Sequence, residues 1–594
     1  TILLMNSEFN INNKKLGRDT MNNAEKHGTI AREHYGSHRN HRSIIAALNK
    51  RLTMDVLRQR RQAGALCSND AKSCYDRVVH NIASLSMRRQ GAPKNAVKCM
   101  FLTLQKAAHK IRTAFGLSTH THGSDRDPPY QGLGQGNGCG PAGWALVSTP
   151  LINMMKTAMF GFTILTALTV TSVAFVCYAF VDDTDVVHTA KDINTTGETI
   201  LLEMQQCVDH WEGGLRATGG ALVPSKSYWY LIDFIWDGKK WKYATKEDIP
   251  GDISIRTADG TDRVNLTRYD VDHAEETLGI YLAMDGNNKA ECAALRKKAN
   301  NYANCIRTGF LSRDDAVVAL HSTIMKSLEY PLAAITMTKA QWDHVMSPLL
   351  QAALPRMGYV RSFPYDIVYA PKELLGLGIM HPWFNQELTH LEICLQEGTA
   401  KTITGDLLRA SSEQMRIELG LLSQLGEATA VTKKALTLST DCWLKKAHEF
   451  ASHHGMRLED TSLNLCSRRE DDCFLIEEFI RFGYHGAELR MLNECRMHLK
   501  TVCLSELVTA DGGRINEWAW KGKGIKKEQS LNQYQWPCSP TKLSNGHWTL
   551  WRQGLERCFL LLQSSDQTLR ARLGKIKPNL HSHWRWFHSA SEER

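Results

Sequence analysis

No two cysteines stand in the C-x-x-C spacing of zinc ribbons and redox pairs, although the chain has 16 cysteines among 594 residues. Scattered cysteines of this kind are typical of a reduced intracellular compartment, where most act as small apolar side chains. A looser group has no spacing that we associate with zinc: Cys466, Cys473, Cys495, His498 and Cys503. We therefore expect an intracellular protein and do not predict a zinc site.

A leader peptide, internal repeats and long low-complexity tracts are also missing, and the chain begins with Thr1 rather than methionine. This beginning predicts a fragment or a reading frame cut at its start. One charge-free run, residues 158–181, is long enough to cross a bilayer. It is rich in β-branched and hydroxyl residues, however, and ends directly on Asp182 and Asp183 without a basic anchor. We interpret the run as a helix followed by a buried strand, and we predict no membrane span.

The length and the charge of the chain indicate how many domains it has and what kind of partner it would bind. A chain of 594 residues is too long for one hydrophobic core, which predicts roughly two to four domains. Lys and Arg outnumber Asp and Glu by 72 to 62, which leaves a net charge of +10. This excess suits a polyanionic partner such as nucleic acid, although many basic proteins bind none.

Two acidic sites carry the clearest chemistry. An apolar run over residues 65–67 leads into Asp70, which places a carboxylate at the carboxyl end of a predicted strand. A strand-end Asp that caps the next helix is the alternative. At Asp182 and Asp183, apolar residues precede and follow the pair, which is typical of a tight hairpin with acids at its tip. Adjacent acids repel unless a cation neutralises them, and strand alternation predicts that Asp182 faces Asp70 while Asp183 is more peripheral.

Two further segments suit phosphate recognition. Residues 131–141 contain five glycines, which let backbone amides approach a ligand closely, although a flexible surface loop would look the same. Gly213 and Gly214 are followed by residues 224–226, in which Lys226 could reach a phosphate or simply be solvated.

Strand and helix patterns surround these segments. Residues 228–282 alternate in the manner of strands, with Gly-containing turns. A helix is predicted from about Lys289 to Arg307, stopping near Gly309, and another begins at Ser312, whose hydroxyl can cap it.

In this order, the segments resemble the motifs of reverse transcriptases, with the closest likeness to the group II intron and non-LTR retrotransposon branch. The residues that match are Asp70, Cys74, Tyr75 and Asp76, then Gly132, Gln135, Gly136 and Pro141, then Phe180, Val181, Asp182 and Asp183. Residues 33–39 resemble a fingers motif, residues 277–280 the hairpin that grips the primer, and residues 376–379 a motif beyond the thumb. Gly134 and Gly140 depart from the usual Pro and Ser.

The resemblance, which covers about residues 1–400, implies an α+β right-hand polymerase followed by a mostly helical C-terminal region. Partial fingers would cover residues 1–66, the palm 67–282, and the thumb with its connection 283–400, while residues 401–594 have no predicted role. The implied activity is RNA-directed DNA synthesis by a retroelement enzyme. Its partners would be an RNA template, a DNA primer and deoxynucleoside triphosphates, and no oligomeric state is indicated.

The resemblance also implies residue roles. Asp70, Asp182 and Asp183 would be the catalytic residues and would hold two Mg²⁺ ions, or Mn²⁺ in their place. The residues expected to bind substrate are Tyr75, Gln135, Gly136 and Lys226. The residues expected to contact nucleic acid are Arg39, Arg42, Arg296, Lys297 and Lys298.

Two other functions compete with this one. RNA-dependent RNA polymerases usually place an acid five residues after the first catalytic Asp, where this chain has Tyr75, bulky enough to exclude a ribose 2′-hydroxyl. A decayed or domesticated nucleic-acid-binding protein is the alternative from another class, and the intact acids at positions 70, 182 and 183 argue against decay at the site.

The C-terminal third has no assigned function. Residues 510–513 resemble the start of a ribonuclease H domain, but companion acids are missing and Asp-Gly is a common turn. Seven tryptophans lie among lysines in this region: Trp518, Trp520, Trp536, Trp548, Trp551, Trp584 and Trp586. They would suit stacking on bases, but aromatic core packing is the favoured interpretation.

Overall fold

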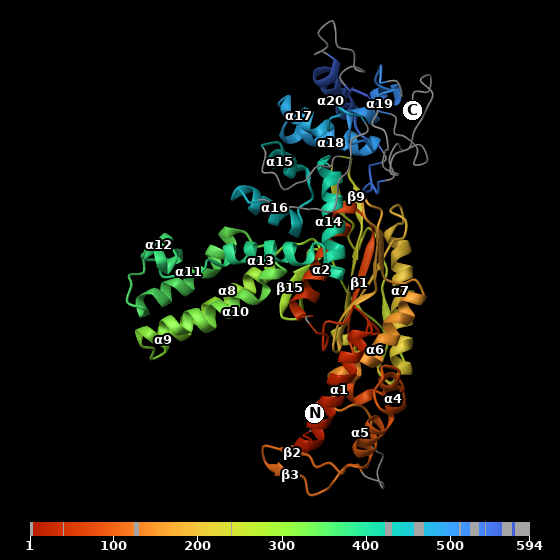
Figure 1. The fold of residues 1–594 in the computed structure, drawn as a ribbon, viewed down its shortest axis with the longest axis vertical. Helices are drawn as coiled ribbons and strands as arrows, with labels where there is room; N and C mark the ends of the chain where they lie inside the picture. Colours follow the sequence, from red (N-terminus) through yellow and green to blue (C-terminus); the bar gives the residue numbers. More distant parts are fainter. Residues whose placement is uncertain are drawn as a thin grey trace.

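The structure is a computed structural model that describes residues 4–39, 41–123, 130–238, 240–421, 430–456, 469–509, 512–522, 534–540, 542–560 and 573–575. Figure 1 shows a central sheet, a group of green helices that extends to the left of it, and the blue C-terminal helices at the top. The fold mixes helices and strands, as the sequence predicts.

Five strands form the central sheet in the order β13-β8-β1-β7-β6. Their bounds are Gly64–Asp70 for β1, Cys177–Phe180 for β6, Asp183–Thr189 for β7, Tyr228–Ile232 for β8 and Thr267–Tyr269 for β13. All neighbours are antiparallel except β13 and β8, which are parallel. Helices α2 and α7 lie on opposite sides of the sheet in Figure 1, which explains why the residues of the middle strands are buried almost without interruption.

The other strands form two-stranded hairpins, and most helices surround the sheet. The hairpins pair β2 (Arg112–Thr113) with β3 (Gly116–Leu117), β4 (Phe162–Leu165) with β5 (Ser172–Phe175), β9 (Phe234–Trp236) with β10 (Trp241–Tyr243), β11 (Ser254–Arg256) with β12 (Arg263–Asn265), and β14 (Ala274–Thr277) with β15 (Ile280–Ala283). The first seven helices are α1 (Ser7–Lys26), α2 (Ser43–Arg60), α3 (Cys74–Arg77), α4 (His80–Arg89), α5 (Lys94–Lys106), α6 (Gly140–Thr157) and α7 (Gly197–Ala217).

The later part of the described chain is helical. The group at the left of Figure 1 contains α8 (Lys289–Thr308), α9 (Arg313–Val318), α10 (Met325–Glu329), α11 (Lys339–Arg356), α12 (Tyr365–Tyr369) and α13 (Pro382–Glu397). The C-terminal group contains α14 (Ile403–Leu419), α15 (Ala430–Ala435), α16 (Trp443–His453), α17 (Leu475–Arg481), α18 (Gly486–Leu499), α19 (Glu517–Lys521) and α20 (Asn545–Leu555).

The charge-free run over residues 158–181 contains no helix, so that part of the prediction is wrong. α6 ends at Thr157, and the run forms β4, β5 and β6 instead. Its many threonines and valines explain the outcome, because β-branched side chains fit strands better than helices. Among the helices of the described residues, none is both long and apolar enough to cross a membrane.

The predicted helix limits after residue 288 are confirmed. α8 begins at Lys289 and is followed by Gly309. Ser312 caps α9: its hydroxyl accepts a hydrogen bond from the backbone of Asp315, whose carboxylate accepts one from the backbone of Ser312. This reciprocal pair is the capping box that Ser with an acid three residues later favours.

One of the hydrophobic cores extends across much of the described chain. Its buried side chains extend from Tyr35 near the beginning to Leu573 near the end. α2 lies inside it: all residues from Ala46 to Arg60 are buried, and α14 packs along the helix. The region predicted to begin at residue 401 therefore shares its core with the segments before it.

α2 can bury charged side chains because they pair with one another. Asp55 is fully buried and forms ion pairs with Arg51 and Arg58. Its other carboxylate oxygen accepts a hydrogen bond from the backbone N–H of Trp443, at 2.6 Å. A buried charge is tolerated only with such partners, so this cluster ties α2 to the beginning of α16.

α13 carries an acid in the protein interior. Glu387 is 4% exposed, and its Oε1 accepts a hydrogen bond from Gln386 at 2.9 Å. Burial outweighs that bond and raises the pKa of Glu387 from 4.5 to about 7. Because the folded protein then holds the proton more tightly than the unfolded chain, this side chain makes the free energy of unfolding fall as pH rises from about 4.5 to 7.

Replacing Glu387 with glutamine should therefore raise the free energy of unfolding at pH 8 by about 2 kcal/mol and leave it almost unchanged at pH 4. Denaturant unfolding at the two pH values measures the effect. Glu392→Gln, an exposed position on the same helix, is the control and should change neither value. An equal gain at both pH values would show that the carboxyl is not held at a raised pKa.

The described tryptophans of the C-terminal third pack in the interior. Trp551 is fully buried and Trp536 is 6% exposed. Trp518, Trp520 and Trp548 are half-buried against the same core. Core packing, the favoured interpretation, is confirmed for these five.

The cysteine group considered for zinc and the segment that resembles a ribonuclease H domain lie partly outside the described residues. Cys495 and Cys503 are buried in hydrophobic clusters. Within the residues that the structure describes, no three His, Cys, Asp or Glu side chains are grouped so that they could hold a metal ion. Cys466, Asp511, Trp584 and Trp586 lie outside the described residues.

Candidate active site at the end of strand β1

Strand β1 carries an acid to the end of the central sheet. β1 ends at Asp70, as predicted, and β7 begins at Asp183. The antiparallel register sets these two residues directly opposite each other. The backbone N–H of Ala71 donates to the carbonyl of Asp182 at 3.1 Å. Opposed residues on neighbouring strands point to the same face, so the carboxylates of Asp70 and Asp183 share one face of the sheet. The predicted acidic hairpin is therefore confirmed.

The turn between β6 and β7 adopts a strained backbone conformation. Val181 has a φ of +59°, which a β-branched residue rarely adopts. The indole N–H of Trp144 donates to the Val181 carbonyl. Gly36 leaves room for the turn, because a Cβ there would lie 3.0 Å from Val181 Cγ2. The neighbouring N–H of Tyr35 donates to the carbonyl of Ala179 at 2.8 Å. Residues 33–39 and the acidic turn, which are far apart in sequence, are thus in direct contact.

The two acids of the turn have different surroundings. Asp183 and Asp70 both line a cavity of about 240 Å³. Asp182 acts electrostatically on Cys74 and Tyr75, at the beginning of α3, and also on Asp183 and Lys226. Both acids therefore belong to the same site. The prediction that Asp183 is the more peripheral acid is wrong, because Asp183 lies opposite Asp70 and lines the cavity with it. That Asp182 faces Asp70 stays a prediction.

Lys226 neutralises only part of the negative charge at this site. Lys226 Nζ lies 3.1 Å from Asp70 Oδ2, and this hydrogen bond raises the pKa of Lys226. Burial, followed by Asp182, Asp185 and Asp70, raises the pKa of Asp183 to about 6. Burial and neighbouring carboxylates both disfavour the charged form of Asp183, and the opposite effect of Lys226 is smaller.

The donor set fits a divalent cation. Carboxylate oxygens are the ligands that Mg²⁺ prefers, and a cation would remove the repulsion that raises the pKa of Asp183. Asp70, Asp182 and Asp183 are the residues of this site that would supply the oxygens. In the described part of the chain they do not already form a ligand cluster, so the metal ions stay a prediction.

Tyr75 lies between the acidic turn and the Gly-rich loop. Its side chain is half-buried, and a Cβ on Gly140 would lie 3.6 Å from its ring. The N–H of Leu133 donates to the Tyr75 carbonyl at 2.6 Å. Gly132 allows this approach, because its φ is +91° and a Cβ would lie 2.4 Å from the same carbonyl oxygen. Burial, followed by Cys74 and Asp182, raises the pKa of the Tyr75 hydroxyl, so the ring is neutral.

Gln135 and Gly136 lie on the outer part of that loop. Asp76 Oδ1 accepts hydrogen bonds from the backbone of Gln135 at 3.3 Å and from the Tyr130 hydroxyl at 2.8 Å. The Gly136 carbonyl accepts one from Asn10 at 3.2 Å. These bonds attach the loop to α3 and to α1. The side chain of Gln135 is exposed. Its contact with a nucleotide stays a prediction, as does that of Gly136 and of Lys226.

Sequence reasoning missed a buried ion pair behind the acidic turn. Lys50 is 1% exposed, and its Nζ lies 3.2 Å from Asp185 Oδ2 and 2.8 Å from Thr277 Oγ1. Burial disfavours the charge of Lys50, but Asp185 and Tyr228 outweigh it and raise the pKa. The contact joins α2 and β7 to the hairpin of β14 and β15. Asp185 could have been found from the sequence, because it lies two residues after Asp183 and so on the same face of β7.

The predicted hairpin at residues 277–280 is present and faces this site. β14 ends at Thr277 and β15 begins at Ile280, with a two-residue turn at Leu278 and Gly279. Both turn residues have positive φ, as type I′ hairpin turns require. Thr277 and Leu278 line the same cavity as Asp70 and Asp183. The hairpin is therefore placed to contact a ligand that lies on the acids.

The predicted nucleic-acid-binding residues fall in two places. Arg39 and Arg42 are exposed ahead of α2. The other three lie on α8, where Lys298 donates a hydrogen bond to the Ser327 carbonyl at 2.6 Å. Their contact with nucleic acid stays a prediction.

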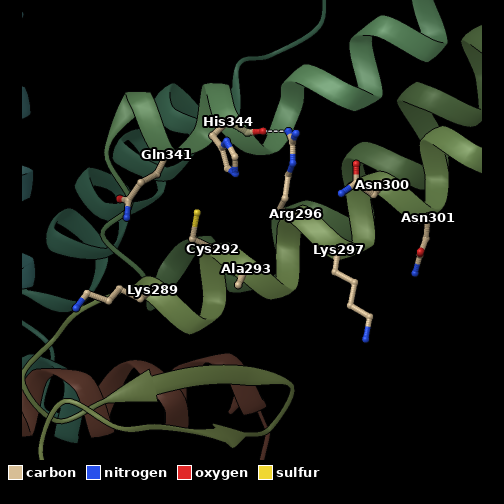
Figure 2. Close-up of a pocket in the computed structure, with 9 residues that line it drawn as sticks. All are labelled: Lys289, Cys292, Ala293, Arg296, Lys297, Asn300, Asn301, Gln341 and His344. Carbon is tan, nitrogen blue, oxygen red and sulfur yellow. Dashed lines mark hydrogen bonds between the residues drawn. The ribbon is translucent and has the colours of Figure 1, made fainter.

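A groove of about 620 Å³ lies between α8 and α11. Figure 2 shows the side chains that line it. Arg296 points across the groove and donates to the carbonyl of His344 on α11. Lys297, one residue later, is exposed and points away from α11. Of these two cations, Lys297 is therefore the one placed to meet a phosphate, while Arg296 joins the helices.

Replacing Lys297 with alanine should flatten the salt dependence of binding to a primer–template duplex. The loss of one phosphate contact lowers the slope of the logarithm of the binding constant against the logarithm of the salt concentration by about 0.9. Fluorescence anisotropy between 50 and 200 mM salt, about the range over which such contacts act, measures the slope. Lys401→Ala removes an exposed lysine elsewhere and should leave the slope unchanged. Equal slopes for the Lys297 variant and the wild type would mean that this lysine meets no phosphate.

Comparisons with known proteins give limited information. No protein-family model matches the chain, and a search of the curated proteins finds no match. Among solved structures, telomerase from Candida albicans in complex with a TWJ fragment of telomeric RNA is similar over 67% of this chain and 56% of its own, with 11% identity and a TM-score of 0.25. Apo telomerase from Candida tropicalis is similar over 68% of this chain and 60% of its own, with 12% identity and a TM-score of 0.27.

This chain therefore spans less than two thirds of the telomerase chains that it resembles. At these TM-scores no residue role is transferred from them. Residue roles are therefore assigned from the geometry of the site itself.

Proposed function

We propose that the chain is a reverse transcriptase, an RNA-directed DNA polymerase of the non-LTR retrotransposon and group II intron-like branch. One observation carries the proposal: segments that are far apart in sequence and that match the family motifs meet at a single site. Asp70 lies opposite Asp183, with Tyr75 beside Asp182 and Lys226 on Asp70.

In this proposal the central sheet belongs to the palm, α1 and residues 33–39 to the fingers, and α8 to α11 to the thumb. The hairpin of β14 and β15 would hold the primer, because it lines the cavity beside Asp70 and Asp183. The packing of residues 33–39 against β6 supports this arrangement, since it brings the predicted fingers to the acidic turn.

The three acids would hold two Mg²⁺ ions, which when bound would lower the pKa of the primer hydroxyl and neutralise the triphosphate. The protein itself positions the reacting groups. Asp70 and Asp183 face the cavity where a primer end would lie, and Lys226 offers a positive charge beside them. Tyr75, held against Gly140, would lie below the sugar of the incoming nucleotide.

Primer extension with Mg²⁺ on matched RNA and DNA templates tests the proposal. Deoxynucleotide incorporation on the RNA template is the expected result. Efficient synthesis from ribonucleotides would instead indicate an RNA polymerase. Template binding without extension under any condition would indicate a nucleic-acid-binding protein that has lost or never had catalysis.

A further inference from the structure

The net positive charge of the protein is concentrated in one segment. Residues 77–124 contain no Asp or Glu, although the chain has 62 of them in all. The same segment contains eight cations: Arg77, Arg88, Arg89, Lys94, Lys98, Lys106, Lys110 and Arg112. Since the net charge of the whole chain is +10, the rest of the chain is close to neutral.

These cations form a ridge along α5 that continues onto a hairpin. Lys94, Lys98 and Lys106 recur at multiples of four residues and are all exposed, so they lie on one face of α5. The opposite face of α5 is buried in the core. Lys110 and Arg112 are exposed on the β2–β3 hairpin that follows. No residue within the segment is acidic, so nothing in the segment itself offsets this positive charge.

The hairpin ends in a phenyl ring that is fully in solvent. Phe115 lies in the two-residue turn between β2 and β3 and is 101% exposed. The Thr113 hydroxyl accepts a hydrogen bond from the Phe115 N–H at 3.1 Å, so the backbone of the tip is held in place. Ile111 and Leu117 beside it are 55% and 64% exposed. Folding leaves these three apolar side chains together at the surface, and a contiguous exposed apolar patch is typical of an interaction site.

The ridge lies next to the Gly-rich loop of the candidate site. His80 of α4 lies with Nε2 2.6 Å from the Gly132 carbonyl, and its Nδ1 is 2.9 Å from Gln105 of α5. Figure 1 shows the β2–β3 hairpin at the bottom of the molecule, extending to the same side as α8 to α12. A nucleic-acid strand that reaches the Gly-rich loop would therefore contact this ridge next.

We propose that α5 and the β2–β3 hairpin bind single-stranded nucleic acid, with the cations on its phosphates and Phe115 stacked on an unpaired base. Cations with an aromatic side chain among them are the combination that non-specific single-strand binding uses. A duplex would engage the cations but would offer Phe115 no free base face, because its bases already stack on one another. A membrane surface is disfavoured, because only three large apolar side chains project from the hairpin.

Two substitutions at the tip test the stacking. The full chain is mixed with a labelled 20-nucleotide oligouridine, or with an RNA duplex of equal length, in EDTA without nucleotides, and anisotropy is recorded. Phe115→Leu should weaken single-strand binding about tenfold, while Phe115→Trp keeps it within about twofold, because only the second retains an aromatic face. Neither should change duplex binding. Equal affinity of the two variants for the single strand would overturn the proposal.

A second pair of variants tests the charge. Lys110→Ala with Arg112→Ala should lower the log–log salt slope for the single strand by about 1.4, at about 0.7 for each lost contact. The matched control is Lys433→Ala with Lys434→Ala, two exposed lysines on α15. If the control lowers the slope as much, the effect reflects total charge and the proposal is wrong.

Sedimentation with phosphatidylserine vesicles tests the membrane alternative. The expected result is no binding above that to phosphatidylcholine vesicles. Binding that Phe115→Leu retains would overturn the proposal in favour of a lipid surface. The binding assays need neither metal nor catalysis, so failure of the polymerase proposal would leave their outcome unaffected.

Discussion

Replacing Asp70 with asparagine should lower the rate of Mg²⁺-dependent primer extension by about a thousandfold or more, which corresponds to about 4 kcal/mol of lost transition-state stabilisation. The side chain keeps its size but loses the charge that would attract a divalent cation. Asp70 is the acid that both β7 and Lys226 approach, so its loss affects the centre of the site. Asp182→Asn should cause a loss of the same order.

Single-turnover extension on a preformed primer–template measures the rate, and anisotropy in the same buffer checks that binding is retained. Asp314→Asn is the matched control, because it removes one exposed carboxylate at the beginning of α9. It should extend primers at the wild-type rate. Extension by the Asp70 variant at a near-normal rate would exclude the two-metal assignment.

Replacing Tyr75 with alanine should raise ribonucleotide incorporation relative to deoxyribonucleotide incorporation by about two orders of magnitude or more. The ring is held between Gly140 and the acidic turn, so it cannot move aside easily. A deoxyribose fits against it, whereas a 2′-hydroxyl would collide with the ring and lose water without gaining a hydrogen bond.

The ratio of the two kcat/KM values measures this discrimination. Tyr75→Phe is the matched control, because it removes the hydroxyl and keeps the ring, and it should preserve the wild-type ratio. If Tyr75→Ala leaves the ratio unchanged, another residue excludes ribonucleotides, and the main reason to prefer DNA synthesis is lost.

The parts of the site that follow from local rules could be predicted. An apolar run that ends on Asp70 predicts a strand end, and the acidic pair within an apolar run predicts a hairpin, and both are present. The helix limits at Lys289 and Ser312 follow from capping, which depends on residues within one turn.

Other features depend on contacts that the sequence does not display. Which of Asp182 and Asp183 opposes Asp70 is decided by the number of residues in the turn, and a shift by one residue exchanges their faces. The charge-free run over residues 158–181 was predicted to contain a helix because apolar periodicity does not distinguish a buried helix from buried strands. Lys50 and Asp185 are 135 residues apart, and only the packing of α2 beside β7 brings them together.

The shared core around α2 also limits how the protein can be divided for experiments. An expression boundary at residue 400 would remove α14, which packs along α2, and would expose a helix buried on all sides. It would also remove the Trp443 backbone N–H that donates a hydrogen bond to Asp55, so this buried carboxylate would lose one of its partners. We therefore expect a truncated product to aggregate, because it would expose apolar surface that the full chain buries. α14 and α16 thus complete the hydrophobic core in which α2 lies.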